Sequence, residues 1–64
     1  MYITIGEEII SLDNIYSVKI MWDNVKGDYI KIRYNDERFK NIKAVSKEDA
    51  TFIFNKIQHK LGCA

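Results

Sequence analysis

Residues 16–34, YSVKIMWDNVKGDYIKIRY, decide the fold of this chain. In the first half, successive side chains alternate between two faces, and the more apolar face carries Tyr16, Val18, Ile20 and Trp22. The second half alternates in the same way, and its apolar face carries Ile30, Ile32 and Tyr34. A period of two residues is typical of a half-buried strand. The polar segment 23–28, which includes Gly27, predicts a hairpin loop between two antiparallel strands.

Two shorter apolar runs precede this hairpin, at residues 2–5 and 8–12. They flank Gly6 and Glu7, and glycine supplies the positive φ that a tight hairpin turn needs. Residues 12–15 then predict a turn, because Asp13 and Asn14 bond readily to nearby backbone groups. After a further turn at 35–38, residues 39–45 are β-like. Their pattern does not decide which of them face the core. Phe39 and Ile42 can share a face only if the strand contains a bulge.

The last part of the chain predicts an amphipathic helix. Ser46 and Asp49 form an S-x-x-D capping pattern, and Gly62 provides the stop. One stripe at helical spacing carries the apolar residues Ala50, Ile53, Phe54, Ile57 and Leu61. Such a stripe must cover the face of a sheet.

Together these elements predict a single α+β domain spanning residues 1–64. We expect an antiparallel meander of about five strands within residues 2–45, with one C-terminal helix at about 47–61 packed on one face. Sixty-four residues leave room for no more than one domain. Because one helix covers only one face, the other face is solvated or covered by a partner.

Composition limits the environment and the class of partner. The net charge of +1 creates no global field toward nucleic acid or membrane. No signal-peptide pattern or membrane-length apolar run is present, and Cys63 is the only cysteine. We therefore expect a cytoplasmic protein in a reducing compartment, without disulfides and without a membrane association.

Residues with catalytic or ligand-binding potential are sparse. The sequence has no phosphate-binding glycine motif, nucleophile elbow or histidine cluster, so we expect no enzymatic activity and no cofactor. His59 and Cys63 are spaced as two metal ligands could be, but Gly62 lies between them and no second pair exists. We predict no metal site.

Two surfaces could serve a partner. The outward sheet face is expected to carry Tyr2, Thr4, Ile9, Lys19, Met21, Tyr29, Lys31 and Arg33. It fits an ordinary solvated face, a protein interface, or a platform on which the bases of single-stranded nucleic acid stack. Acidic loop residues argue against the last interpretation, namely Asp23, Asp28, Asp36 and Glu37. On the helix, Phe52 lies nearly opposite the core stripe. It is a partner anchor, or it belongs to a core stripe wider than the one above, or it is covered by the N-terminus.

The order of elements resembles a group of short bacterial and phage proteins of unknown function, with strands followed by one helix. The similarity is carried by residues 9–15, by residues 29–32 and by the Ser46-capped helix. The chain is also similar to the small flagellar protein family, which has a Leu-Asn turn before a strand and a C-terminal helix. It departs from that family in the loop at 22–27. The resemblance implies the fold rather than a function.

We therefore expect a non-enzymatic protein-interaction module that self-associates as a two-fold dimer. It would act as an adaptor or as an inhibitor of a larger protein, for example a phage-encoded inhibitor of a host system. The expected partner contacts are Ile9, Met21, Tyr29 and Phe52. The alternative is binding of single-stranded nucleic acid or a nucleotide through the open sheet face, by Tyr2, Lys19, Tyr29, Lys31 and Arg33.

Overall fold

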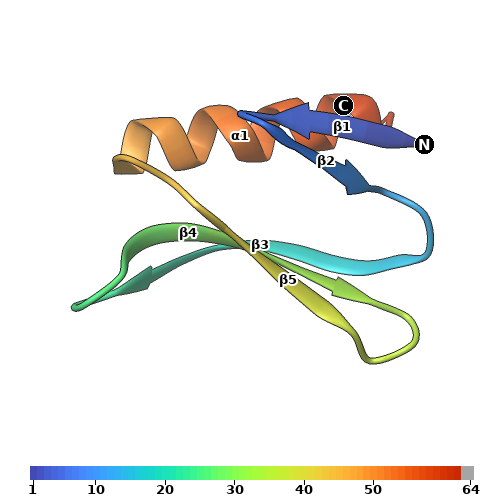
Figure 1. Cartoon of the computed structure of the whole chain (residues 1–64), viewed down its shortest axis with the longest axis horizontal. Coiled ribbons are helices and arrows are strands. Elements are labelled where there is room, and N and C mark those ends of the chain that lie inside the picture. The colour runs from blue at the N-terminus through green and yellow to red at the C-terminus, as the bar shows by residue number, and fades with distance from the viewer. Residues whose placement is uncertain (63–64) are drawn as a thin grey trace.

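The computed structural model describes residues 1–62 and contains five strands followed by one helix (Figure 1). The elements are β1 (Tyr2–Ile5), β2 (Glu8–Ser11), β3 (Ile15–Asp23), β4 (Gly27–Tyr34), β5 (Phe39–Lys43) and α1 (Lys47–Lys60). All strand pairs are antiparallel. The predicted α+β class, the five antiparallel strands and the C-terminal helix are confirmed, but β2 and β3 do not pair, so the strands do not form one continuous meander.

The five strands are divided between two sheets. β1 pairs only with β2, while β3, β4 and β5 form a three-stranded sheet in that order. The chain turns away from the first hairpin at Asn14, whose φ of 59° places it in the left-handed region that asparagine tolerates. The hairpin and α1 lie together over one face of the three-stranded sheet (Figure 1). The hairpin thus covers the part of the sheet that a single helix leaves open.

The core lies between these two layers. It combines buried side chains from the hairpin, the sheet and the helix: Ile3, Ile10, Leu12, Ile30, Ile32, Ile42, Ala44, Ala50, Ile53 and Ile57. Polar contacts also join the layers. The hydroxyl of Tyr34 donates to the carbonyl of Ser11 at 2.7 Å, and Lys40 of the sheet forms an ion pair with Glu8 of the hairpin.

Helix α1 begins at the predicted cap. The Ser46 hydroxyl accepts a hydrogen bond from the Asp49 amide at 3.1 Å. The Asp49 carboxylate accepts in turn from the Val45 amide at 2.9 Å, one residue before the donor of a standard capping box. The predicted core stripe is confirmed, because three of its residues are buried and Phe54 and Leu61 pack against the core.

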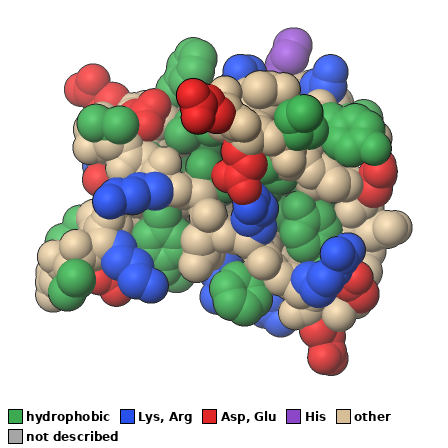
Figure 2. Space-filling model, in the orientation of Figure 1, with side chains coloured by type: hydrophobic (Ala, Val, Ile, Leu, Met, Phe, Trp, Pro, Cys, Tyr) green, Lys and Arg blue, Asp and Glu red, His purple; other side chains and the backbone are tan. Residues whose placement is uncertain are grey.

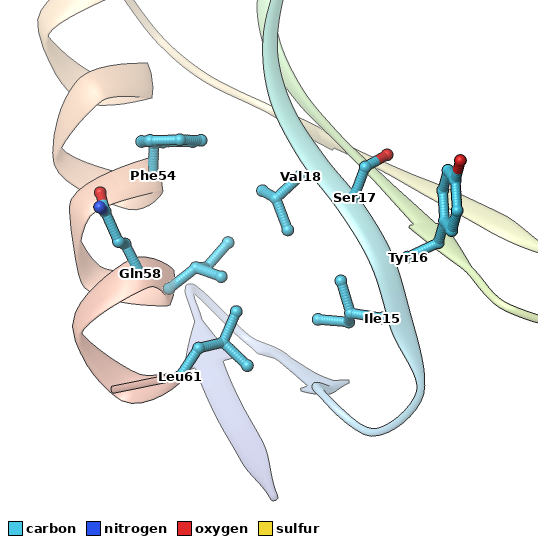
Figure 3. Close-up of a pocket in the computed structure, with 8 residues that line it drawn as sticks. Ile15, Tyr16, Ser17, Val18, Phe54, Gln58 and Leu61 are labelled. Atoms are coloured by element: carbon cyan, nitrogen blue, oxygen red, sulfur yellow. The ribbon is translucent and has the colours of Figure 1, made fainter. Parts of the chain in front are cut away.

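The phase of β3 differs from the prediction at its start. The β3–β4 register shifts between Ile15 and Ser17, and this bulge moves Tyr16 off the core face. Figure 3 shows Ile15 and Val18 on the helix side of β3, and Tyr16 and Ser17 pointing away from it. The assignment of Tyr16 to the apolar face is therefore wrong. Tyr16 is 70% exposed.

The phase of β5, open from the sequence, is set by its pairing with β4. Ile42 lies opposite Ile30 and is buried, whereas Phe39 lies opposite Arg33 and is exposed. The register runs without interruption along the strand. Phe39 and Ile42 therefore occupy opposite faces, and β5 needs no bulge.

Candidate functional site

One face of the three-stranded sheet points away from the helix and the hairpin and is left open (Figure 1). Residues directly opposite each other in adjacent strands share a face, so the registers define its members. They form three rows across the sheet: Ser17–Arg33–Phe39, Lys19–Lys31–Asn41 and Met21–Tyr29–Lys43. We call these nine residues, together with Tyr16 from the bulge, the outer face.

Four of the ten basic residues of the chain lie on the outer face, namely Lys19, Lys31, Arg33 and Lys43. Within residues 1–62, the ion pairs use other cations: the Met1 amino group, Arg38 and Lys40. Lys19 and Lys31 are directly opposite each other in the β3–β4 ladder. Like charges in this position repel, so the folded chain carries a local electrostatic cost on this face.

The acidic residues expected to neutralise this surface are mostly engaged elsewhere. The Asp23 carboxylate accepts hydrogen bonds from the amides of Val25 at 2.7 Å and Lys26 at 3.0 Å. These two bonds hold the pKa of Asp23 below its ordinary value, and the bond from Lys26 has the larger effect. Asp28 lies opposite Trp22, on the other face of the sheet.

Asp36 is held within its own turn. Its carboxylate accepts from the amide of Arg38 at 3.2 Å and from the guanidinium Nε of the same residue at 2.7 Å. The backbone bond from Arg38 is the main reason that the pKa of Asp36 is lowered. The carboxylates of Asp23 and Asp36 thus stay ionised but have their hydrogen-bonding capacity largely taken up by local groups.

Three aromatic rings accompany the cations. Tyr29 is half-buried in the middle strand, while Phe39 and Tyr16 project at the opposite end of the face. The Lys31 ammonium lies 5.3 Å from the centroid of the Phe39 ring, and the Arg33 guanidinium lies 5.7 Å from that of Tyr16. Cation–π contacts at these distances orient both rings. Basic side chains alternate with hydrophobic ones over the lower half of the molecule, where this sheet lies (Figure 2).

The structure brings together most of the residues predicted for nucleic-acid binding. Lys19, Tyr29, Lys31 and Arg33 share the outer face. Tyr2 does not belong with them, because it is exposed on the outside of the β1–β2 hairpin, in the other layer.

Five members of the outer face are absent from the predicted list: Ser17, which the alternation of β3 places there, and Tyr16, Phe39, Asn41 and Lys43. The last three alternate with Lys40 and Ile42, so placing Ile42 in the core would have identified them. The position of Tyr16 depends on the bulge, for which the sequence has no clear signal.

The residues predicted as partner contacts, on the sheet face and on the helix, are distributed over three surfaces. Met21 and Tyr29 are neighbours on the outer face. Ile9 projects from the outside of the hairpin, and Phe52 lies on α1 beside the β1–β2 turn, lining a hollow of about 620 Å³. The four residues therefore cannot contact one partner as a single compact patch.

A separate apolar hollow lies between α1 and β3 (Figure 3). Its volume is about 290 Å³, and its lining includes Ile15, Val18, Phe54, Ile57 and Leu61. We call it the α1–β3 groove. Ile20 and Trp22 continue the same face of β3 beyond the groove and are 40% and 66% exposed.

The described residues also bear on a metal site and on a membrane-spanning helix. Residues 1–62 contain no group of three or more histidine, cysteine, aspartate or glutamate side chains arranged to hold a metal ion. Of His59 and Cys63, which are spaced as two metal ligands could be, the second lies outside the described part of the chain. In that same part, no helix has the length and apolar character required to cross a membrane.

No family model, no curated protein and no solved structure matches this chain. The outer face and the α1–β3 groove are therefore interpreted from their own chemistry.

Proposed function

We propose that this chain is a non-enzymatic binding module whose outer face binds single-stranded nucleic acid. The observation that carries the proposal is the directly opposed pair Lys19 and Lys31, which stands among three aromatic rings. A polyanion placed over these lysines would remove their repulsion. Sites where a folded protein keeps such a local conflict are often functional.

The geometry of the outer face favours single strands over duplexes. Rows of side chains on one face of a strand repeat every two residues, which is about 6.7 Å. The Tyr29 row and the Phe39 row therefore flank the Lys19–Lys31 row at about that spacing on each side. Bases can stack on the rings of the two flanking rows while phosphates lie near the lysines of the middle row. The outer face is formed by paired strands and presents no projecting helix or ribbon to enter the groove of a duplex.

The proposal is tested by fluorescence anisotropy with labelled single-stranded DNA and RNA. If all four cations contact phosphates, affinity should fall about fifty-fold between 50 and 200 mM salt. Lys31→Gln should weaken binding and reduce the logarithmic salt slope by about 0.7. Lys60→Gln removes the same charge from the end of α1, in the other layer, and should leave both quantities unchanged.

Two outcomes would overturn this function. One is the absence of binding at 50 mM salt. The other is an equal loss of affinity in Lys31→Gln and Lys60→Gln, which would show that only total charge matters. Tighter binding to duplex DNA of equal length would reassign the ligand.

The lone cysteine, Cys63, supports a further proposal of a reducing, cytoplasmic location, where such ligands occur.

Protein association is the second candidate function, and a different surface favours it. Edge strand β3 carries the exposed apolar side chains of Ile20 and Trp22 on the face that α1 only partly covers. Self-association through this edge agrees with the dimer expected from the small size of the chain. The wider role of an adaptor or inhibitor stays a prediction.

A further inference from the structure

Strand β3 is an open edge of the three-stranded sheet. It extends over nine residues and pairs only with β4. Among residues 1–62, its other side takes part in no main-chain hydrogen bond. Such an edge is a template on which another strand can pair, and β3 contains no proline and only one lysine that would discourage this.

The two ends of β3 are complementary to each other. We call the face of the sheet opposite the outer face the inner face. Toward the C-terminal end of β3, the inner face carries Ile20 and the large indole of Trp22, both uncovered, and the adjoining loop carries the exposed Val25. Toward its N-terminal end, the inner face opens into the apolar α1–β3 groove (Figure 3). A two-fold axis through the middle of the strand would place each projecting end against the groove of the other copy.

We propose that two copies of this chain pair antiparallel along β3, with the two-fold axis at Ile20. This inference rests on the second candidate function, self-association, and not on nucleic-acid binding. Ile20 then lies opposite Ile20 of the second copy, and Trp22 lies opposite its Val18. Each Trp22 enters the α1–β3 groove of the other copy, and the two outer faces become continuous across a six-stranded sheet.

Other registers fit less well. An axis at Lys19 would place two lysines directly opposite each other. An axis at Met21 pairs Lys19 with Asp23, whose carboxylate already accepts two amide hydrogen bonds, and moves Trp22 away from the groove. A register displaced by one residue would join the inner face of one copy to the outer face of the other.

Trp22 is the only tryptophan, so its fluorescence reports directly on the proposed contact. Light scattering and emission spectra should be recorded from about 1 μM to about 1 mM protein, a range that covers moderate dimer affinities. We expect the mass to double and the emission to shift to shorter wavelength over the same concentration range.

Variants test the register. Ile20→Lys and Trp22→Ala should each raise the dissociation constant by about thirty-fold or more, as expected for central contacts. Val45→Lys alters a side chain that is 96% exposed and lies outside this surface, so it should leave the dimer unchanged. Because Ile20→Lys could perturb folding, circular dichroism should confirm its structure, and Trp22→Ala serves as the independent variant.

Three results would overturn the inference: a monomer at about 1 mM, a dimer whose Trp22 emission is independent of concentration, or a dimer that resists both substitutions. Ile20 and Trp22 lie on the inner face, away from the cations of the outer face. Failure of the dimer therefore leaves the cations of the outer face in place on each copy, and the two proposals can fail separately.

Discussion

At the scale of single residues, the Lys19–Lys31 pair links stability to the proposed function. Lys19→Glu replaces a repulsive cross-strand pair with an attractive one. We expect the free energy of unfolding to rise by about 0.2–1 kcal/mol, while the affinity for single-stranded DNA falls. Urea denaturation at low protein concentration measures the first effect, and anisotropy measures the second. A variant that is less stable than the native chain, or that binds equally well, would contradict this trade-off.

Asp23 makes the β3–β4 turn sensitive to acid. Its pKa is lowered in the folded chain by the amides of Lys26 and Val25. A carboxyl of lowered pKa stabilises the fold above its unfolded value, near 3.8, and loses that contribution as the pH falls through the folded value.

Asp23→Asn keeps an oxygen that can accept these bonds but does not titrate. Between about pH 5 and pH 2, the native chain should therefore lose more stability than the variant. Thermal unfolding over this pH series measures the difference. Parallel stability curves for the two proteins would show that the turn does not depend on the charge of Asp23.

At the scale of elements, neighbouring residues of α1 have opposite roles. Ile53 is buried against the sheet, whereas Phe52 is 66% exposed. Ile53→Ala should cost about 2–5 kcal/mol, since it leaves a cavity in the core. Phe52→Ala should change stability by no more than about 0.5 kcal/mol. Chemical denaturation of the two variants measures both values, and equal destabilisation would show that the hollow beside Phe52 contributes to the core.

Strand β3 contributes to three surfaces of the molecule. Its inner face contributes Val18 to the groove, its outer face contributes Lys19 to the basic surface, and its free edge is the proposed dimer contact. The bulge at the start of β3 divides its residues between the groove and the outer face, because it moves Tyr16 to the outer face while Ile15 remains beside the helix. A regular strand would place the consecutive residues Tyr16 and Ser17 on opposite faces, whereas the bulge leaves both on the outer side.

At the scale of the whole molecule, two layers enclose one small core and leave one sheet face open (Figure 1). The hairpin and α1 together cover most of the inner face, and the large apolar side chains that stay exposed include Ile20 and Trp22 at the β3 edge, Phe52 on α1 and Ile9 on the hairpin. In the proposed dimer, the outer faces of two sheets join. A longer single strand could then cross both copies, and association would increase the number of phosphate contacts without any new type of site.

The sequence by itself determined the elements of this protein. Alternation placed Ile30 and Ile32 in the core and Lys31 and Arg33 outside, and the Ser46 cap located the start of α1. These features depend on local periodicity and on hydrogen bonds between near neighbours, which a single chain segment specifies.

The tertiary structure alone decided how these elements combine. The separation of the hairpin from the main sheet removed Tyr2 and Ile9 from the outer face, and pairing with β4 placed Phe39 and Lys43 on it. Strand pairing and the β3 bulge are contacts between distant segments, and several arrangements satisfy the same local pattern. The composition of the outer face therefore follows from packing between layers, because only the assembled core determines which side of each strand remains exposed.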